Sequence, residues 1–114
     1  MKIAIIGLGF VGLSLASVLS ASGIKVIGID IDKEKCQKIA NGVAPFFEKD
    51  LEKTLQKGLR KQLEISHDVS LIKTCDYIFV TVGTPQRLNG AIELSMIKKV
   101  INSIGNNLKK TNKD

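Results

Sequence analysis

Three glycines near the start of this chain constrain its fold more than any other feature. Gly7, Gly9 and Gly12 follow the mostly apolar run from Lys2 to Ile6 and lie at the start of a helical segment from Phe10 to Ser22. A short apolar run is typical of a strand that is buried on both faces, and glycines directly after it allow a tight turn. The sequence therefore predicts a strand, a glycine turn and a helix in that order.

The same glycines argue against a secretory signal. Lys2, the apolar run from Ile3 to Leu19 and the small residues from Ser20 to Ser22 imitate such a signal. However, the glycines interrupt that run, and a signal core has no need of them. Cys36 and Cys75 show no metal or redox spacing, which suits a reducing compartment. We therefore expect a cytoplasmic protein.

Predicted strands and helices alternate along the rest of the chain. Further strands are expected at Lys25 to Asp30, Leu63 to Ser66 and Asp76 to Val82. Helices are expected after an N-cap at Asp32 as far as Ala40, from Glu48 to Arg60 and from Ser95 to Leu108, with a helical turn at Val69 to Lys73. Alternation implies a parallel sheet with right-handed crossovers. The expected fold class is α/β, a Rossmann-type doubly wound parallel sheet, truncated at about four strands with flanking helices.

Three of the predicted helices carry apolar stripes that indicate a core-facing side. In the last, from Ser95 to Leu108, the apolar residues alternate three and four apart, at Leu94, Ile97, Ile101, Ile104 and Leu108. In the helix from Phe10 to Ser22 the stripe comprises Val11, Leu15, Val18, Leu19 and Ser22. In the helix from Glu48 to Arg60 it comprises Leu51, Leu55 and Leu59, spaced four apart. These residues are the predicted helical part of the core.

An acidic residue completes the glycine pattern. Asp30 closes the second predicted strand, 18 residues after Gly12, and the order of strand, glycines, helix, strand and acid is typical of dinucleotide binding. Gly7 would permit the tight turn, Gly9 would let the backbone approach a pyrophosphate, and Gly12 would let the helix pack on the sheet. The helix N-terminus would offer its free N–H groups to the diphosphate.

The same acid predicts which dinucleotide binds. Asp30 would accept hydrogen bonds from the ribose hydroxyls, and its charge would repel the 2′-phosphate of NADP, so the predicted cofactor is NAD. Asp32 is a competing candidate, although its position suits a helix N-cap. The alternative for Asp30 is a solvated acid at the end of a strand.

A second loop follows the last predicted strand. It contains Val82, Gly83, Thr84 and Pro85. Because ligands in open α/β sheets lie outside the carboxyl ends of the strands, we expect this loop to face the dinucleotide. The alternative is an ordinary turn.

The charge of the chain fits an anionic ligand better than a nucleic acid. The formal net charge is +6, but the lysines are dispersed and no aromatic residues are interleaved with them as stacking platforms. The single histidine, His67, leaves no His/Cys set for a metal. We expect no partner among nucleic acids or membranes and no metal.

Three stretches together resemble the UDP-glucose/GDP-mannose dehydrogenase family. The first is Met1 to Gly12 with Ile29 to Asp32, and the second is Ala44 to Glu48 with Leu51, which resembles that family's "PfxEpgL" segment. The third runs from Val82 to Ser95 and is similar to its "VxTPxxxdGxxDLS" segment. The resemblance covers essentially the whole chain.

The resemblance implies an NAD-dependent, two-step oxidation of a nucleotide-sugar alcohol to the uronic acid, on UDP-glucose, UDP-N-acetylmannosamine or GDP-mannose, by a homo-oligomer. It implies that residues 1–114 form the N-terminal NAD-binding domain, without the substrate and catalytic domains. It places the pyrophosphate at Gly7, Leu8, Gly9, Phe10, Val11 and Gly12, and the ribose at Asp30 with Lys35 nearby. By the same resemblance, the cofactor cleft would be lined by Val82, Gly83, Thr84 and Pro85.

The chain also departs from the family pattern. Lys49 and Asp50 stand where the family usually has Pro and Gly, and Glu93 replaces the acid of "DLS". The family's nucleophilic cysteine has no match in this chain, since neither Cys36 nor Cys75 lies in the sequence motif that surrounds that cysteine in the family. No catalytic residue is therefore assigned, and the isolated chain is expected to be inactive.

Two alternative functions remain at this point. The chain could belong to another Rossmann dehydrogenase of the 3-hydroxyacid or 6-phosphogluconate type, or it could be a stand-alone NAD-binding regulatory module. The second and third stretches of the resemblance argue against the other dehydrogenases.

Overall fold

The structure is a computed structural model that describes residues 1–81. The predicted helix from Ser95 to Leu108 and the loop Val82 to Pro85 lie outside the described residues.

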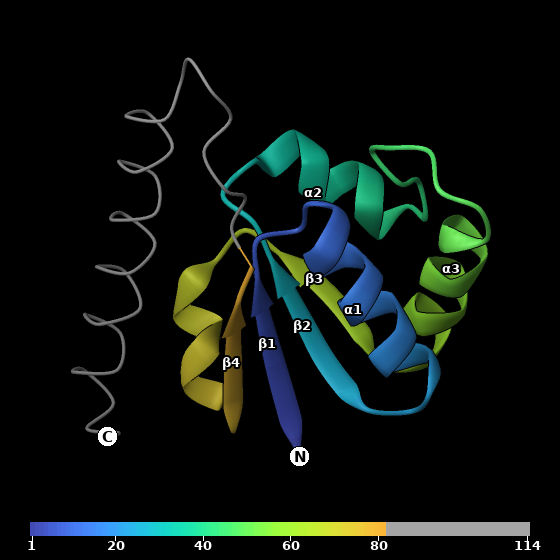
Figure 1. The fold of residues 1–114 in the computed structure, drawn as a ribbon. Coiled ribbons are helices and arrows are strands. Elements are labelled where there is room, and N and C mark those ends of the chain that lie inside the picture. Colours follow the sequence, from blue (N-terminus) through green and yellow to red (C-terminus); the bar gives the residue numbers. More distant parts are fainter. Residues whose placement is uncertain (82–114) are drawn as a thin grey trace.

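A parallel four-stranded sheet forms the centre of the described part of the chain (Figure 1). The strands lie in the order β3-β2-β1-β4, and every neighbouring pair is parallel. Their bounds are β1 Lys2–Ile6, β2 Lys25–Ile29, β3 Leu63–Ser66 and β4 Tyr77–Val80. The helices are α1 Phe10–Ala21, α2 Lys33–Ala40, α3 Leu51–Lys61 and a short 3₁₀ segment, η1, at Val69–Thr74. The predicted fold class, α/β with a Rossmann-like parallel sheet, is confirmed.

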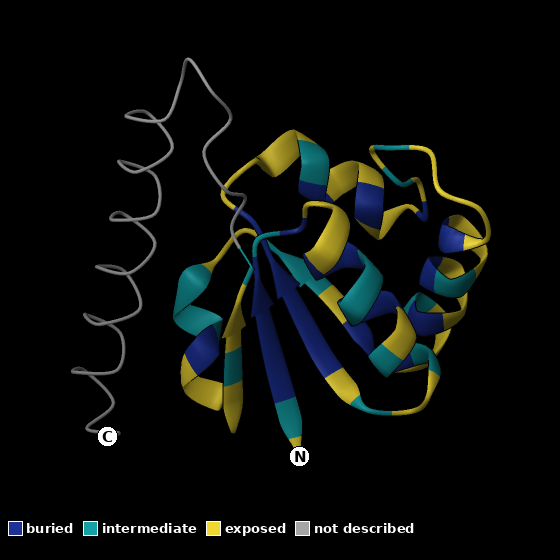
Figure 2. Ribbon diagram, in the orientation of Figure 1, coloured by how far each residue is buried: buried dark blue, intermediate teal, exposed yellow. Residues whose placement is uncertain are grey.

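The sheet separates two apolar clusters because alternate residues of a strand point to opposite faces. Ile3 and Ile5 of β1 pack on the side of α1, α2 and α3, in a cluster with Leu13, Ile39 and Leu55. Ala4 and Ile6 pack on the side of η1, in a cluster with Ile27, Ile29, Ile72 and Cys75. Figure 2 shows that β1 and β2, at the centre of the sheet, are almost entirely buried. Their continuous apolar runs therefore follow from burial on both faces.

The core-facing side of α1 differs from the predicted stripe. Val11 and Val18 are 64% and 56% exposed, whereas the buried residues are Gly12, Leu13, Ala16, Ser17 and Ser20. Leu15 and Leu19 are only partly buried beside the core. The reason is close packing, because α1 packs against both the sheet and α3. A Cβ added at Gly58 of α3 would collide with Ser20, so small residues face the core in place of large ones.

The start of α3 is also later than predicted. The helix begins at Leu51 and not at Glu48, because Asp50 adopts a left-handed conformation with φ 65°. A left-handed residue cannot continue a right-handed helix. The predicted apolar face is confirmed, since Leu51 and Leu55 are buried and Leu59 packs against the same cluster.

Among the described residues, β4 ends the sheet on the side away from β2. Its large side chains are more exposed than those of the central strands, with Tyr77 at 56%, Phe79 at 44% and Val80 at 45%. Strand β4 is thus an apolar strand with one neighbour, β1, within the described part of the chain.

Candidate cofactor site

The three glycines of the turn between β1 and α1 differ in their structural requirements. Gly7 has a φ of +95°, which side chains of L-residues rarely tolerate. A Cβ at Gly12 would collide with the carbonyl oxygen of Gly7 and the hydroxyl of Thr81. A Cβ at Gly9 would meet no atom within 4 Å. The fold therefore requires glycine at positions 7 and 12, whereas position 9 faces open space.

Within residues 1–81, the N-terminus of α1 has no side-chain cap. Gly9 is the N-cap residue and has no side chain to offer, and the first turn holds no acidic residue. The first hydrogen bond of the helix runs from the Leu13 N–H to the Gly9 carbonyl at 2.9 Å. The preceding N–H groups of the first turn therefore have no partner within the helix. Such a helix start attracts an anion by its N–H groups and by its dipole.

Asp30 lies directly beside the glycine turn, at the carboxyl end of β2. Its Oδ2 accepts a hydrogen bond from the Leu8 N–H at 2.8 Å, and its Oδ1 accepts one from the Asp32 N–H at 3.0 Å. Lys35 of α2 forms an ion pair with the same Oδ2 at 3.1 Å. Sequence reasoning placed Asp30 and Lys35 at one subsite, and the structure brings them into contact.

The surroundings of Asp30 favour its charged form. Burial raises the pKa of this carboxyl group, since only 8% of the residue is exposed. The hydrogen bonds from Asp32, Leu8 and Lys35, with the positive charge of Lys35, outweigh burial and lower the pKa below its ordinary value. Asp30 is therefore a carboxylate at neutral pH. A carboxylate has about four acceptor positions, so it retains capacity for a ligand hydroxyl.

Asp32 has the structural role that its position suggested. It is the N-cap of α2, and its Oδ1 accepts a hydrogen bond from the Lys35 N–H at 3.1 Å. The competing candidate for the ribose is thus engaged in capping a helix. Asp30 is the acid that contacts the glycine turn.

Thr81 is a residue of this site that sequence reasoning missed. It directly follows β4, and its Oγ1 lies 2.7 Å from the Gly7 carbonyl oxygen and 3.1 Å from that of Ile6. The only sequence signal was a hydroxyl residue at the end of an apolar strand. A pattern within the first strand and helix could not indicate it, because 74 positions separate Thr81 from Gly7.

An aromatic pair connects the glycine turn to the segment before α3. The rings of Phe10 and Phe46 lie 5.5 Å apart between centroids and are tilted by 40°. Phe46 belongs to the stretch from Ala44 to Glu48 that carries the second part of the family resemblance. The next residue, Phe47, is 97% exposed. The second stretch is therefore adjacent in space to the first.

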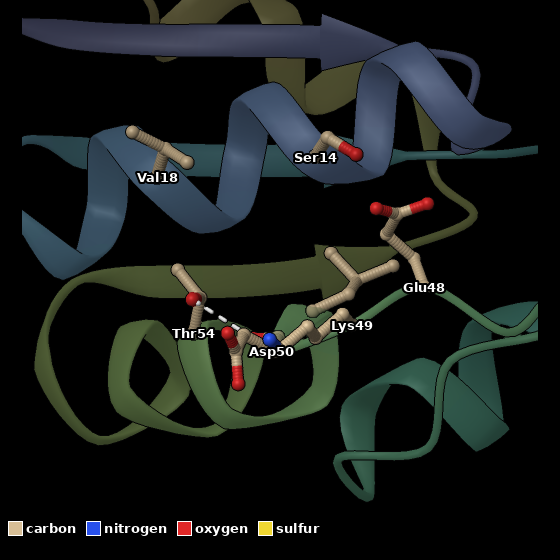
Figure 3. Close-up of a pocket in the computed structure, with 7 residues that line it drawn as sticks. Ser14, Val18, Glu48, Lys49, Asp50 and Thr54 are labelled. Atoms are coloured by element: carbon tan, nitrogen blue, oxygen red, sulfur yellow. Dashed lines mark hydrogen bonds between the residues drawn. The ribbon is translucent and has the colours of Figure 1, made fainter.

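A separate hollow lies between α1 and the start of α3 (Figure 3). It is lined by Ser14, Val18, Glu48, Lys49, Asp50, Leu51 and Thr54. In Figure 3 the side chain of Glu48 extends toward Ser14, and Thr54 donates a hydrogen bond to the Asp50 carbonyl at 3.0 Å. None of the predicted cofactor residues within residues 1–81 lines this hollow, and its own carboxylates suit a dinucleotide poorly.

The cysteines and the histidine lie in ordinary structural positions. Cys36 and Cys75 are buried and unpaired. Burial raises the pKa of the Cys36 thiol, against the opposing effect of its hydrogen bond to the Asp30 carbonyl, so this thiol is poorly suited to be a nucleophile. His67 is exposed. Within residues 1–81, no group of three or more His, Cys, Asp or Glu side chains is arranged to hold a metal.

The remaining predicted residues, Val82, Gly83, Thr84 and Pro85, lie outside the described part of the chain. Across residues 1–81, no helix is both long and apolar enough to cross a membrane.

Comparison with known proteins gives a match along almost the whole chain. Residues 1–113 match the profile described as UDP-glucose/GDP-mannose dehydrogenase family, NAD binding domain. A GDP-mannose 6-dehydrogenase of Pseudomonas syringae pv. syringae is 41% identical over 107 residues, which cover 92% of this chain and 24% of that protein. The UDP-glucose 6-dehydrogenase TuaD of Bacillus subtilis is 37% identical over 109 residues, covering 94% of this chain and 24% of that protein.

A solved structure of the family has the same fold as this chain. A ternary complex of GDP-mannose dehydrogenase from Pseudomonas aeruginosa superposes with a TM-score of 0.86 at 38% identity. The superposition covers 95% of this chain and 25% of that one. The chain thus spans about a quarter of the length of the relatives it matches.

Proposed function

Because this chain belongs to the UDP-glucose/GDP-mannose dehydrogenase family, whose NAD-binding domain it matches over residues 1–113, we propose that it binds NAD at the glycine turn. We propose further that it serves as the cofactor domain of a nucleotide-sugar 6-dehydrogenase. Such an enzyme would oxidise UDP-glucose, UDP-N-acetylmannosamine or GDP-mannose to the uronic acid.

The observation that carries the NAD proposal is the open space at Gly9 beside an uncapped helix. No atom of the described residues lies within 4 Å of a Cβ built at this residue, and the α1 N-terminus has neither a side-chain cap nor an acid in its first turn. A pyrophosphate fits both features, because it needs close approach to the backbone and supplies the missing negative charge. The residues present therefore fit the cofactor.

Each predicted residue has a task in this proposal. The turn from Gly7 to Gly12 binds the pyrophosphate through backbone N–H groups, and Asp30 accepts hydrogen bonds from the adenine ribose. Lys35 holds the carboxylate of Asp30 through their 3.1 Å ion pair. The loop from Val82 to Pro85 is proposed to line the cleft further along the dinucleotide. NAD, when bound, supplies the hydride acceptor, and the protein orients it.

The substrate side of the reaction is proposed to come from sequence other than residues 1–114. About three quarters of each relative lies outside the matched part, and no residue here matches the family's nucleophile. Proximity of the sugar hydroxyl to the cofactor would then be lost in the isolated chain. Strand β4, whose Tyr77, Phe79 and Val80 are exposed, has one neighbouring strand within residues 1–81. It is expected to cause self-association, since an apolar edge strand favours contact between copies.

Two assays test the proposal separately. Calorimetric titration with NAD is expected to show saturable binding, and absence of binding would refute the cofactor role. NADH formation with UDP-glucose, UDP-N-acetylmannosamine or GDP-mannose is expected to be absent. Turnover that disappears in Cys36→Ser or Cys75→Ser would show that one of these cysteines is catalytic.

Light scattering after gel filtration measures the expected self-association.

A further inference from the structure

We propose that Thr81 is a positioning residue for the cofactor, because its hydroxyl fixes the orientation of the peptide group between Gly7 and Leu8. This inference rests on the proposed NAD site, and it assigns a task to a residue outside the glycine pattern. It also makes the end of β4 a part of the pyrophosphate site.

The first step is the contact of Thr81 with the carbonyl end of that peptide. The Thr81 backbone N–H donates to the Ile6 carbonyl at 2.7 Å, which continues the pairing of β4 with β1. The side-chain Oγ1 lies 2.7 Å from the Gly7 carbonyl oxygen and 3.1 Å from that of Ile6. A hydroxyl has a single hydrogen to donate, and the shorter distance favours Gly7 as its acceptor.

The second step concerns the other end of the same peptide. The Leu8 N–H donates to Asp30 Oδ2 at 2.8 Å, in a buried hydrogen bond. The carbonyl and the N–H of one peptide group are therefore held by Thr81 after β4 and by Asp30 after β2. These strands flank β1 on its two sides, so rotation of the peptide would break both hydrogen bonds.

The third step is the packing around the hydroxyl. A Cβ at Gly12 would collide with both the Gly7 carbonyl oxygen and Thr81 Oγ1. The first turn of α1 thus lies directly against this hydrogen-bonded pair. Displacement of the Gly7 carbonyl would shift the helix start whose N–H groups are to bind the pyrophosphate.

The fourth step is the conformational freedom of the turn itself. Gly7 has a φ of +95°, and glycine populates many backbone conformations with little preference. The turn therefore depends on hydrogen bonds to hold the one conformation that suits the ligand. Preorganisation of this kind appears in affinity for the ligand as well as in stability.

Three variants separate this role from general stability. Thr81→Ala removes the hydroxyl, and Thr81→Ser restores it without the methyl group. Thr74→Ala is the matched control, since Thr74 Oγ1 donates to the Leu71 carbonyl at 2.8 Å in an exposed part of η1. NAD affinity is measured by calorimetry, and urea unfolding establishes that each variant is folded.

We expect Thr81→Ala to weaken NAD binding about tenfold, which corresponds to about 1.4 kcal/mol and to the loss of one hydrogen bond. Thr81→Ser should remain within about threefold of the parent chain, and Thr74→Ala should bind as the parent does. Equal weakening in Thr81→Ala and Thr81→Ser would overturn the proposal, because packing of the methyl group would then be the cause. Parent-like binding by Thr81→Ala would overturn it as well.

Hydrogen exchange of the Leu8 amide gives a readout without nucleotide. We expect exchange about tenfold faster in Thr81→Ala than in the parent or in Thr81→Ser, because loss of one anchor loosens the peptide that Asp30 holds. Unchanged exchange in Thr81→Ala would refute the role of the hydroxyl. If the parent chain failed to bind NAD, the proposed function would fall, and this measurement would still decide whether Thr81 holds the turn.

Discussion

Helices α1 and α3 both begin without a side-chain cap, but their first turns differ in charge. The N-cap of α1 is Gly9, and no acidic residue lies in the first turn. The N-cap of α3 is Asp50, and Glu52 lies in its first turn. Glu52 also accepts a hydrogen bond from the Ala44 N–H at 2.9 Å.

This difference separates a structural helix start from one that suits a ligand. At α3 the protein places its own carboxylates against the positive end of the helix dipole, which stabilises the helix without any ligand. At α1 the dipole has no such partner, and the space beside Gly9 is open. The proposed anion site therefore rests on the lack of an acidic residue in the first turn of α1 together with the open space at Gly9, and an uncapped helix alone would not indicate such a site.

The largest effect is expected from filling the open space at α1. Gly9→Val should lower NAD affinity by more than about 100-fold, since a branched side chain would occupy the pyrophosphate position. The same variant should remain folded, because a Cβ at this position meets no atom within 4 Å. Calorimetry measures the affinity, and circular dichroism with urea unfolding measures the fold. A folded variant that binds NAD as the parent does would show that the glycine turn is not the site.

The choice between NAD and NADP should give the next largest effect. Asp30 is a carboxylate at neutral pH, and its surroundings lower its pKa further below the ordinary value. A carboxylate facing the 2′-phosphate should cost about 1–3 kcal/mol. NADP is therefore expected to bind about tenfold to 100-fold more weakly than NAD. Parallel titrations with both nucleotides test this, and equal affinities would remove Asp30 from the ribose subsite.

A smaller effect should follow from giving α1 the charge pattern of α3. Val11 lies in the first turn and is 64% exposed, so Val11→Glu adds an acid without burying it. Relative to Val11→Gln, this variant should gain about 0.3–1 kcal/mol of stability from the helix dipole. It should also bind NAD about fivefold more weakly, by repulsion of the pyrophosphate.

Urea unfolding and calorimetry on the Val11→Glu and Val11→Gln pair measure the two effects together. Gains in both stability and NAD affinity for the Glu variant would contradict the proposal that an acid in the first turn of α1 repels the bound pyrophosphate.

The smallest effect is expected at the start of α3. Asp50 has a φ of 65° and makes no side-chain capping hydrogen bond, and the related family segment usually carries Gly at this position. Asp50→Gly should raise the free energy of unfolding by about 0.5 kcal/mol, because glycine adopts this conformation without strain. Asp50→Asn is the control, since it removes the charge and keeps the side chain. NAD affinity should not change in either variant, because Asp50 lies outside the glycine turn.

Most of the fold could be predicted from local patterns. The ranges of β1 and β3 agree with the prediction, and Asp32 caps α2 as its position indicated. These features depend on short stretches of sequence, namely buried apolar runs and a capping residue before a helix. The glycine turn was predictable for the same reason, because its spacing and its position after a strand lie within a dozen residues.

The core face of α1 could not be predicted in this way. Periodicity favoured Val11 and Val18, yet both are exposed, and the buried face includes Ala16, Ser17 and Ser20. The periodicity of apolar side chains marks candidates for the core, but the space available to each is set by a second helix. Gly58 of α3 leaves room for the Ser20 side chain. The sequence of α1 alone does not indicate that contact.

The sequence by itself determined the strands, the glycine turn, the acid at the end of β2 and the family resemblance. Tertiary structure alone decided which side of α1 is buried and how the turn is held. The peptide between Gly7 and Leu8 is fixed by Asp30 and Thr81, which come from strands on the two sides of β1. Local patterns follow from dihedral preferences and burial within one segment, whereas these contacts exist only after the parallel sheet has brought distant strand ends together.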